Sequence, residues 1–135
     1  MNSRRHAGTS SDAAETFPRR DRVLHRRDFL RAQSEGRRVH TPHFVLVALP
    51  TADGRLRLGV TVSRRVGDSV RRNRVKRLVR EVFRRNRALF PAACDVVVVA
   101  RVGAATLDYA GVRNEVSAAE AALRRAAREP CATER

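Results

Sequence analysis

A dense run of basic side chains between residues 63 and 87 is the part of this sequence best suited to binding chemistry. From Arg64 to Arg87 it contains eleven Lys or Arg residues and two acids, Asp68 and Glu81. Asn73 lies inside the run, where its amide can both donate and accept hydrogen bonds. Such a set of groups suits contact with a nucleotide, a phosphate or a phosphate-bound hydrated cation.

The same run has the periodicity of a packed helix. Its apolar residues follow the i, i+3, i+4, i+7, i+8 spacing of one helix face, namely Val75, Leu78, Val79, Val82 and Phe83. The opposite face carries Asn73, Arg77, Arg80 and Arg84, with Arg74 and Lys76 on the flanks. We expect the helix to begin after a cap at Asp68 or Ser69 and to be stopped by Pro91. The alternative, a merely solvated basic face, is disfavoured by the charge density and by an Asn in the first turns of the helix.

The residues needed for autonomous nuclease chemistry are missing from the middle of the chain. Between Leu56 and Gly103 the acids are Asp68, Glu81 and Asp95, and each has an ordinary structural explanation. His40 and His43 are the nearest approach to a metal pair, but no Cys or further His accompanies them. Neither a phosphate-binding glycine loop nor a nucleophile motif is present. We therefore predict no catalytic and no metal-ligating residues in this chain.

Length and charge indicate the class of partner. The chain has 135 residues, which suits one domain, and a net charge of +15 from 29 basic and 14 acidic residues. A charge of this size predicts RNA or DNA as the partner, with an anionic membrane as the weaker alternative. No apolar run is long enough to span a bilayer. The two cysteines, Cys94 and Cys131, form no framework, which favours a reducing, cytoplasmic compartment.

The elements around the basic helix predict a small α+β domain. We expect a disordered basic arm over residues 1–20, one domain over 21–128 and a flexible tail over 129–135. A short helix is expected from Arg26 or Arg27 to Glu35, ended by Gly36. A final helix is expected to start after a cap at Asp108.

The strands are expected on both sides of the basic helix. The apolar run 44–49 and the alternating run 55–63 predict two strands, which the turn residues between them would join as an antiparallel hairpin. Residues 95–102 predict a buried strand. The order is α-β-β-(β)-α-β-α, a mixed sheet packed with helices.

The central segment resembles a known family. Residues 72–80, RNRVKRLVR, preceded by LGVTVSRRVG at 58–67, resemble the signature of the bacterial ribonuclease P protein component. The helix ending at Gly36, the strand beginning at Phe44 and the strand 95–101 also fall in the order and spacing of that family. The resemblance covers about residues 22–126.

The resemblance implies a basic subunit of a ribonucleoprotein that removes the 5′ leader from precursor tRNA. In that family the large RNA is the catalyst and holds the magnesium ions. No membrane and no further protein partner are implied. The fold implied contains a left-handed βαβ crossover, against the general preference for right-handed crossovers.

The resemblance also assigns two sets of site residues. The positions that match the RNA-binding motif are Arg64, Arg65, Arg72, Asn73, Arg74, Lys76, Arg77 and Arg80. A cleft between the first helix and the sheet takes the single-stranded leader, and the positions that match it are Phe29, Gln33, Phe44 and Val47. Gln33 and Val47 stand where aromatic residues are common in some members, so stacking on the leader is expected to be weaker here.

Three other functions remain as alternatives. A ribosomal or other structural RNA-binding protein would share the charge and the mixed sheet but would need no leader cleft. A DNA-binding basic zipper is disfavoured because no leucine heptads follow the basic helix. An independent nuclease is the weakest alternative, since the carboxylates it would need are lacking.

Overall fold

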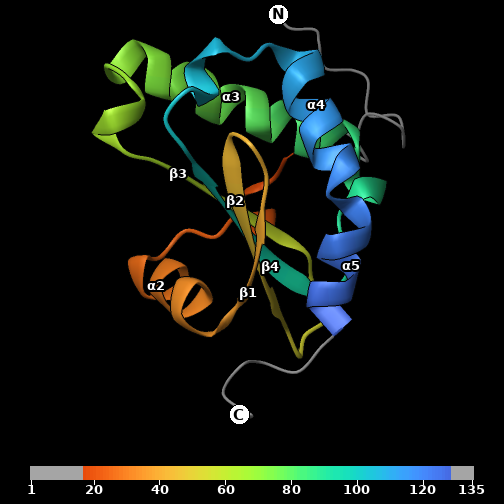
Figure 1. Ribbon diagram of the computed structural model, residues 1–135. Coiled ribbons are helices and arrows are strands. Elements are labelled where there is room, and N and C mark those ends of the chain that lie inside the picture. Colours follow the sequence, from red (N-terminus) through yellow and green to blue (C-terminus); the bar gives the residue numbers. More distant parts are fainter. Residues whose placement is uncertain (1–16, 129–135) are drawn as a thin grey trace, which may run out of the picture.

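The structure, a computed structural model, describes residues 17–128, which form a four-stranded mixed sheet with helices on both faces (Figure 1). The strands are β1 (Arg37–His40), β2 (Phe44–Pro50), β3 (Arg57–Val62) and β4 (Cys94–Ala100). The longer helices are α2 (Arg26–Glu35), α3 (Ser69–Arg85), α4 (Tyr109–Ala118) and α5 (Glu120–Arg128). Short 3-10 helices lie at Arg19–Asp21, Arg64–Val66, Arg87–Leu89 and Ala104–Thr106. This arrangement confirms the predicted α+β class.

Strand β4 lies inside the sheet, although it is the last strand in the sequence. The order is β1-β2-β4-β3, in which β4 is antiparallel to β2 and parallel to β3. The predicted hairpin between 44–49 and 55–63 is therefore wrong, because β4 separates its two strands. The valines of β4 are apolar on both faces and suit the interior of a sheet, whereas β3 alternates with polar residues and suits an edge. The β3–α3–β4 connection is a βαβ unit, and its predicted left-handedness stays a prediction.

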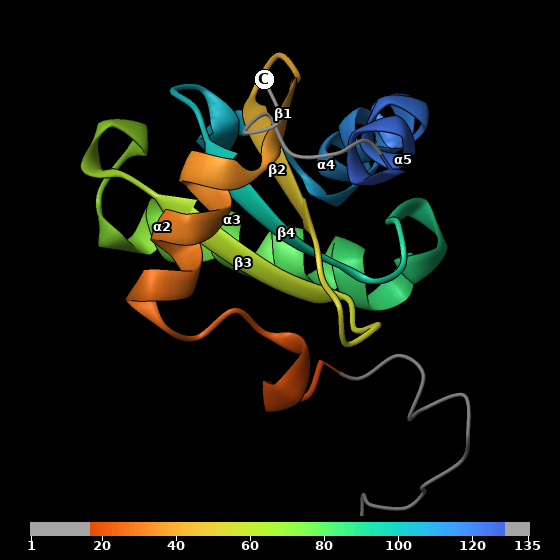
Figure 2. The ribbon, with the colours of Figure 1, turned by 90° about the horizontal axis from the view of Figure 1, so that it is seen from below.

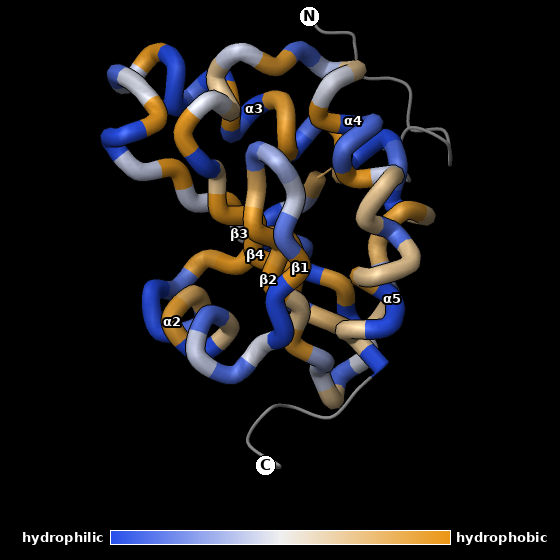
Figure 3. The backbone as a smooth tube through the Cα atoms, viewed as in Figure 1, coloured by the Kyte–Doolittle hydropathy of each residue, from blue (hydrophilic) through white to orange (hydrophobic). Residues whose placement is uncertain are grey.

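The two faces of the sheet pack against different helices. Figure 2 shows α2 on one side of the strands and α3, α4 and α5 toward the other. The larger core lies with α3, α4 and α5, and the smaller one is formed by Ala32 of α2 with Val47, Leu49 and Val97. In Figure 3 the hydrophobic colour is concentrated on the central strands, while hydrophobic and hydrophilic residues alternate along the helices. The two central strands, β2 and β4, are thus largely buried on both faces.

Helix boundaries follow the caps in part. Asp68 Oδ1 accepts a hydrogen bond of 3.0 Å from the Arg71 amide, and Asp108 Oδ1 accepts one of 2.8 Å from Gly111, as predicted. Helix α2 ends at Glu35, before Gly36, also as predicted. Pro91 does not end α3: the helix stops at Arg85, where Asn86 leaves helical geometry with φ −134°. The final helix is divided into α4 and α5 at Ala119.

The predicted disordered arm extends too far along the chain. Residues 17–20 are ordered, because the 3-10 helix Arg19–Asp21 follows Phe17 and Phe17 packs edge-on against Phe83 of α3, with ring centroids 5.3 Å apart. Residues 1–16 and the predicted tail 129–135 lie outside the described residues. Within residues 17–128, none of the helices combines the length and hydrophobicity needed to cross a membrane.

Candidate nucleic-acid interface

Helix α3 is anchored through one apolar stripe. Val75, Val79, Val82 and Phe83 are buried in the larger core, and Leu78 is partly buried beside them. These are the five positions that the sequence pattern predicted. Because this stripe packs against the sheet, the polar side chains on the opposite side of the helix are held at the surface.

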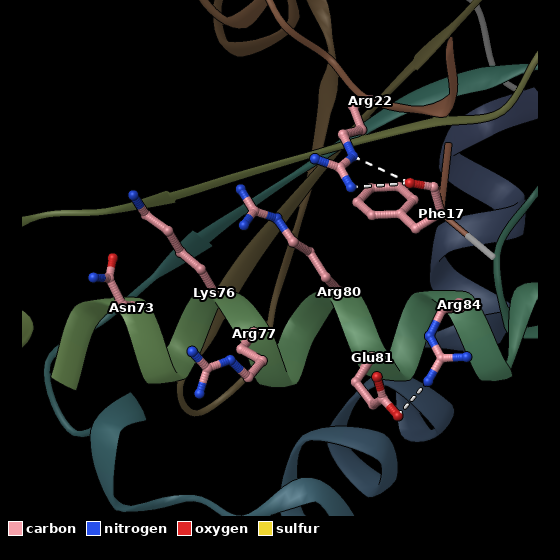
Figure 4. Close-up of a pocket in the computed structure, with 8 residues that line it drawn as sticks. All are labelled: Phe17, Arg22, Asn73, Lys76, Arg77, Arg80, Glu81 and Arg84. Atoms are coloured by element: carbon pink, nitrogen blue, oxygen red, sulfur yellow. Dashed lines mark hydrogen bonds and ion pairs between the residues drawn. The ribbon is translucent and has the colours of Figure 1, made fainter. Parts of the chain in front are cut away.

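A hollow of about 330 Å³ lies beside the exposed face of α3. Its lining is formed by Phe17, Arg22, Asn73, Lys76, Arg77, Arg80, Glu81 and Arg84. In Figure 4, Asn73, Lys76 and Arg80 project from the side of the helix on which Arg22 lies, while Arg77 projects from another side of the helix. The hollow is therefore rimmed mainly by cations.

The acidic groups near this hollow leave its central cations without a counter-ion. Glu81 accepts a hydrogen bond of 2.5 Å from Arg84 and pairs with Arg85 at 2.9 Å. The bond from Arg84 is the main reason that the pKa of Glu81 is lowered. Within residues 17–128, Lys76, Arg77 and Arg80 have no hydrogen bond or ion pair. Their charges remain available to an anion from outside the chain.

Phe17 and Arg22 belong to this site, although the sequence analysis did not select them. The Arg22 guanidinium lies 4.6 Å above the Phe17 ring and donates two hydrogen bonds, of 3.3 and 3.0 Å, to the Phe17 carbonyl. Burial, and then the nearby charge of Arg22, lower the pKa of Arg80. Two like charges are thus held near each other, an arrangement that a bound phosphate would stabilise. The one sequence signal was Phe17, the first aromatic residue in a polar segment.

The other four predicted RNA-binding residues do not line the hollow on α3. Arg72 Nε donates to the Gly67 carbonyl at 3.2 Å. Arg74 Nη1 donates to the carbonyls of Ala105 and Leu107 at 3.1 and 3.0 Å, so it ties α3 to the segment before α4. Arg64 and Arg65 are exposed in the 3-10 helix that precedes α3. Four of the eight predicted residues therefore gather around the hollow, and Arg74 also has a structural role.

A second hollow, of about 390 Å³, lies between α2 and β3. It is lined by Leu24, Arg26, Phe29, Leu30, Gln33, Val60 and Thr61. Two of the predicted cleft residues, Phe29 and Gln33, are among them. The hollow combines apolar side chains with an arginine, an amide and a hydroxyl, groups that can contact both bases and phosphates.

Phe44 and Val47 do not line this cleft, which corrects the prediction. Phe44 is 1% exposed and shares the face of β2 that packs in the larger core, because side chains alternate along a strand. Val47 does face α2, but it is completely covered by that helix and by Val97. Neither side chain can contact a ligand in the cleft.

A row of partly open residues crosses the sheet beside α2. In the register of the strands, Thr61 pairs with Val99, Val99 with Val45, and Val45 with His40. The first three residues are half-buried and His40 is exposed. This row, which we call the cross-sheet row, continues from the hollow at Thr61 toward the β1 edge. The sequence could not reveal it, since it depends on the order of the strands.

Helix α2 is held against the sheet by an ionic and a steric contact. Arg57 forms a bidentate pair with Asp95 and lies 3.8 Å from Asp28 of α2. The ring of Phe29 lies over Gly59, where a Cβ atom would be only 2.7 Å from Phe29 Cε1. These contacts set the height of α2 above β3 and so the width of the cleft.

His43 has a structural partner in Glu115. Glu115 of α4 accepts hydrogen bonds from the Thr41 hydroxyl at 2.5 Å and from the His43 amide at 2.6 Å. His43 Nδ1 lies 2.9 Å from Glu115 Oε1 and must donate, since a carboxylate only accepts. Burial would raise the pKa of Glu115, but the bonds from Thr41 and His43 outweigh it and lower that pKa. Among residues 17–128, no group of three His, Cys, Asp or Glu side chains could hold a metal ion.

Cys94 is a buried core residue. Burial, and then the charge of Asp95, raise the pKa of its thiol to about 12. Its sulfur lies 3.6 Å from the Pro91 carbonyl. The thiol is therefore protonated at neutral pH and is a poor nucleophile.

Comparison with known proteins identifies relatives for most of the chain. A family model described as Ribonuclease P matches residues 17–126. The ribonuclease P protein component of Geotalea uraniireducens is 44% identical over 101 residues, covering 75% of this chain and 88% of the relative. The protein component of Desulfovibrio desulfuricans is 46% identical over 104 residues, covering 74% and 80% of the two chains.

Solved structures show the same fold. The RNase P protein of Thermotoga maritima superposes with a TM-score of 0.67 at 35% identity, covering 77% of this chain and 96% of that one. The RNase P protein of Staphylococcus aureus gives a TM-score of 0.67 at 29% identity, covering 73% and 90%.

Proposed function

This chain belongs to the ribonuclease P protein family, and on that premise we propose that it is the protein subunit of a ribonucleoprotein that removes the 5′ leader from precursor tRNA. Its partners are the large catalytic RNA and the precursor tRNA, with no membrane and no further protein required. It works in the cytoplasm, where both RNAs occur. The bond is broken by the RNA, and this chain contributes binding.

The observation that carries the proposal is the uncompensated cationic hollow on α3. Lys76, Arg77 and Arg80 have no acidic partner within residues 17–128. Their donors suit phosphate oxygens, and the Asn73 amide can add a directed hydrogen bond. We assign this face, with Arg64, Arg65, Arg72 and Arg74 near it, to the catalytic RNA.

The cleft beside α2 is assigned to the leader. Its lining accepts a single strand through the Phe29 ring, the Gln33 amide and the Arg26 guanidinium. A structural RNA-binding protein of the ribosomal kind would use the α3 face without needing this cleft. Tighter binding of precursor tRNA that carries a leader than of mature tRNA would therefore distinguish the proposed function from that of a structural RNA-binding protein.

Magnesium, the cofactor that the family implies, does not fit the cationic face as a directly bound ion. Mg²⁺ requires oxygen ligands, and the α3 hollow offers guanidinium and ammonium groups that repel it. Glu81, the acid of its lining, is already paired with Arg84 and Arg85. The metal is therefore held mainly by the RNA, and the role of this chain is to lower the repulsion between the two RNAs that meet on it.

The test is reconstitution from purified parts. The chain alone should leave precursor tRNA intact, whereas the chain with its cognate large RNA and magnesium should produce mature 5′ ends at low salt. Lys76→Ala with Arg80→Ala should weaken assembly, while Arg55→Ala, an exposed arginine in the turn before β3, should not. Cleavage by the RNA-free chain, or equal assembly by both variants, would contradict the proposal.

A further inference from the structure

A third hollow, of about 240 Å³, lies at the β1 edge of the sheet, the edge opposite β3. It is lined by Arg37, Arg38, Val39, Ala122, Arg125 and Ala126. Strand β1 supplies the first three residues and α5 the others. We call it the β1–α5 groove. The family signature and the α3 hollow contain none of these residues.

The β1–α5 groove is lined by cations and small apolar side chains, with no acid. Arg125 is exposed and forms no hydrogen bond or ion pair within residues 17–128. Of the acids within residues 17–128, the two that lie nearest to the groove along the chain are engaged: Glu120 pairs with Arg124 at 3.0 Å and Glu35 with Arg31 at 3.4 Å. The arginines give the groove a positive potential, and its small apolar side chains leave it narrow. Both properties suit the phosphate backbone of a single nucleic-acid strand. A folded protein partner would find no pocket for a large anchoring side chain among two alanines and a valine.

The groove lies where the cross-sheet row ends. The row runs from Thr61 in the leader cleft to the exposed His40 on β1, three strand spacings, or about 14 Å, away. Arg38 lies on the same face, two positions from His40, and its Nη2 donates to the Gln33 carbonyl at 2.9 Å. This bond uses one of five guanidinium donors, so Arg38 can also contact a phosphate. The two hollows are thus linked by the cross-sheet row, whose two middle residues are half-buried valines, and by Arg38 on β1.

We propose that the 5′-distal part of the leader crosses the sheet along the cross-sheet row, passes over the β1 edge at His40 and binds in the β1–α5 groove. Arg38 and Arg125 contact the phosphates of this part of the leader, so the groove binds it whatever its base sequence. The inference rests on the proposed function, because it extends the leader path assigned to the α2 cleft. It adds a second leader-binding site at the edge remote from α3.

A leader-length series in the holoenzyme tests the proposal. Arg125→Gln removes the charge and keeps a shorter, polar side chain, and Arg55→Gln is the matched control on an exposed turn. Affinity is measured for precursors whose leaders are shortened one nucleotide at a time from the 5′ end. Arg125→Gln should weaken binding of long leaders by roughly fivefold. The affinity of the Arg125→Gln holoenzyme should equal that of the wild type once the leader is too short to reach β1.

The outcomes separate this proposal from the proposed function. If Arg125→Gln lowers affinity equally for every leader length, the groove binds the large RNA or the tRNA body, and the proposal is overturned. No loss at any length also overturns it. If wild-type holoenzyme gains affinity from short leaders but nothing from longer ones, the second site fails while the proposed function stands. If the wild type gains nothing from any leader, the proposed function itself fails.

Discussion

Arg57 of β3 and Asp95 of β4 are register partners, and Nε and Nη2 of the guanidinium donate hydrogen bonds of 2.8 and 2.7 Å to the two carboxylate oxygens. Asp95 is 5% exposed, so its charge depends on this partner. The bond to Asp95 also raises the pKa of Arg57. The pair joins the parallel strands directly beneath the start of α2.

Removing one member of this pair should destabilise the fold. Arg57→Met leaves a buried carboxylate without its partner, and we expect the free energy of unfolding to fall by about 2–3 kcal/mol. Urea denaturation measures the loss. The double variant Arg57→Met with Asp95→Leu should recover much of it, since no buried charge remains. Equal stability of the single and double variants would contradict this account.

Enlarging Gly59 should impair the leader cleft more than assembly. In Gly59→Ala the new Cβ would lie 2.7 Å from Phe29 Cε1 and 3.0 Å from Val23 Cβ, so α2 must move outward. We expect a stability loss of about 1–3 kcal/mol and weaker preference for leader-bearing precursors, measured by competition against mature tRNA. Adding Phe29→Leu makes room for the methyl group and should restore stability. Unchanged stability in Gly59→Ala alone would contradict this steric role.

Two neighbouring arginines on α3 should differ in what they stabilise. Arg74→Ala removes hydrogen bonds to the carbonyls of Ala105 and Leu107 and should lower the free energy of unfolding by about 1 kcal/mol. Arg77→Ala should change it by less than about 0.5 kcal/mol, because Arg77 has no partner within residues 17–128. Arg77→Ala should still reduce the salt slope of RNA binding by about 0.7–0.9. Equal destabilisation by both variants would contradict the distinction.

The only lysine of the chain provides a chemical probe of the α3 hollow. Lys76 lines that hollow and projects from the same side of α3 as Arg80 (Figure 4). Acylation of Lys76 by an amine-reactive ester, followed by mass spectrometry of its peptide, should be slowed by the large RNA. The N-terminal amine serves as the internal reference. Undiminished labelling of Lys76 at saturating RNA would show that this face does not contact the RNA.

Acid should loosen the contact between α4 and the β1–β2 turn. The folded pKa of Glu115 is lowered from 4.5, so its carboxylate contributes stability above that pH and loses it as the pH falls through the lower folded value. Glu115→Gln should cost about 1–3 kcal/mol at neutral pH, and its stability should fall less than that of the wild type below about pH 4.5. Thermal melts across the acid range measure both. Parallel pH profiles for the two proteins would contradict the assignment.

The sequence predicted the elements whose formation depends on local spacing. The apolar stripe of α3, the caps at Asp68 and Asp108 and the end of α2 at Gly36 all follow from residues within one or two turns. The cationic face followed from the same periodicity. Lys76, Arg77 and Arg80 therefore lie where the pattern placed them.

The errors arose where distant segments meet. A strong turn between β2 and β3 favoured a hairpin, and nothing local showed that β4 would lie between them. Phe44 was assigned to the cleft by its resemblance to family aromatics, and only the packing of β2 shows that its side chain lies in the larger core. Phe17 and Arg22 reach α3 only through tertiary packing with Phe83 and Arg80. The cross-sheet row exists only because four strands share one register.

The interior position of β4 has a consequence for synthesis. During translation, α3 emerges with its full set of basic side chains before residues 94–100 leave the ribosome. Until then β2 and β3 have no strand between them, and the apolar stripe of α3 has no finished surface to pack on. A nascent or truncated chain that ends before β4 would therefore expose both a polycation and an unfilled sheet. Synthesis of this one short valine-rich strand therefore joins the two halves of the sheet and gives α3 a surface on which to pack.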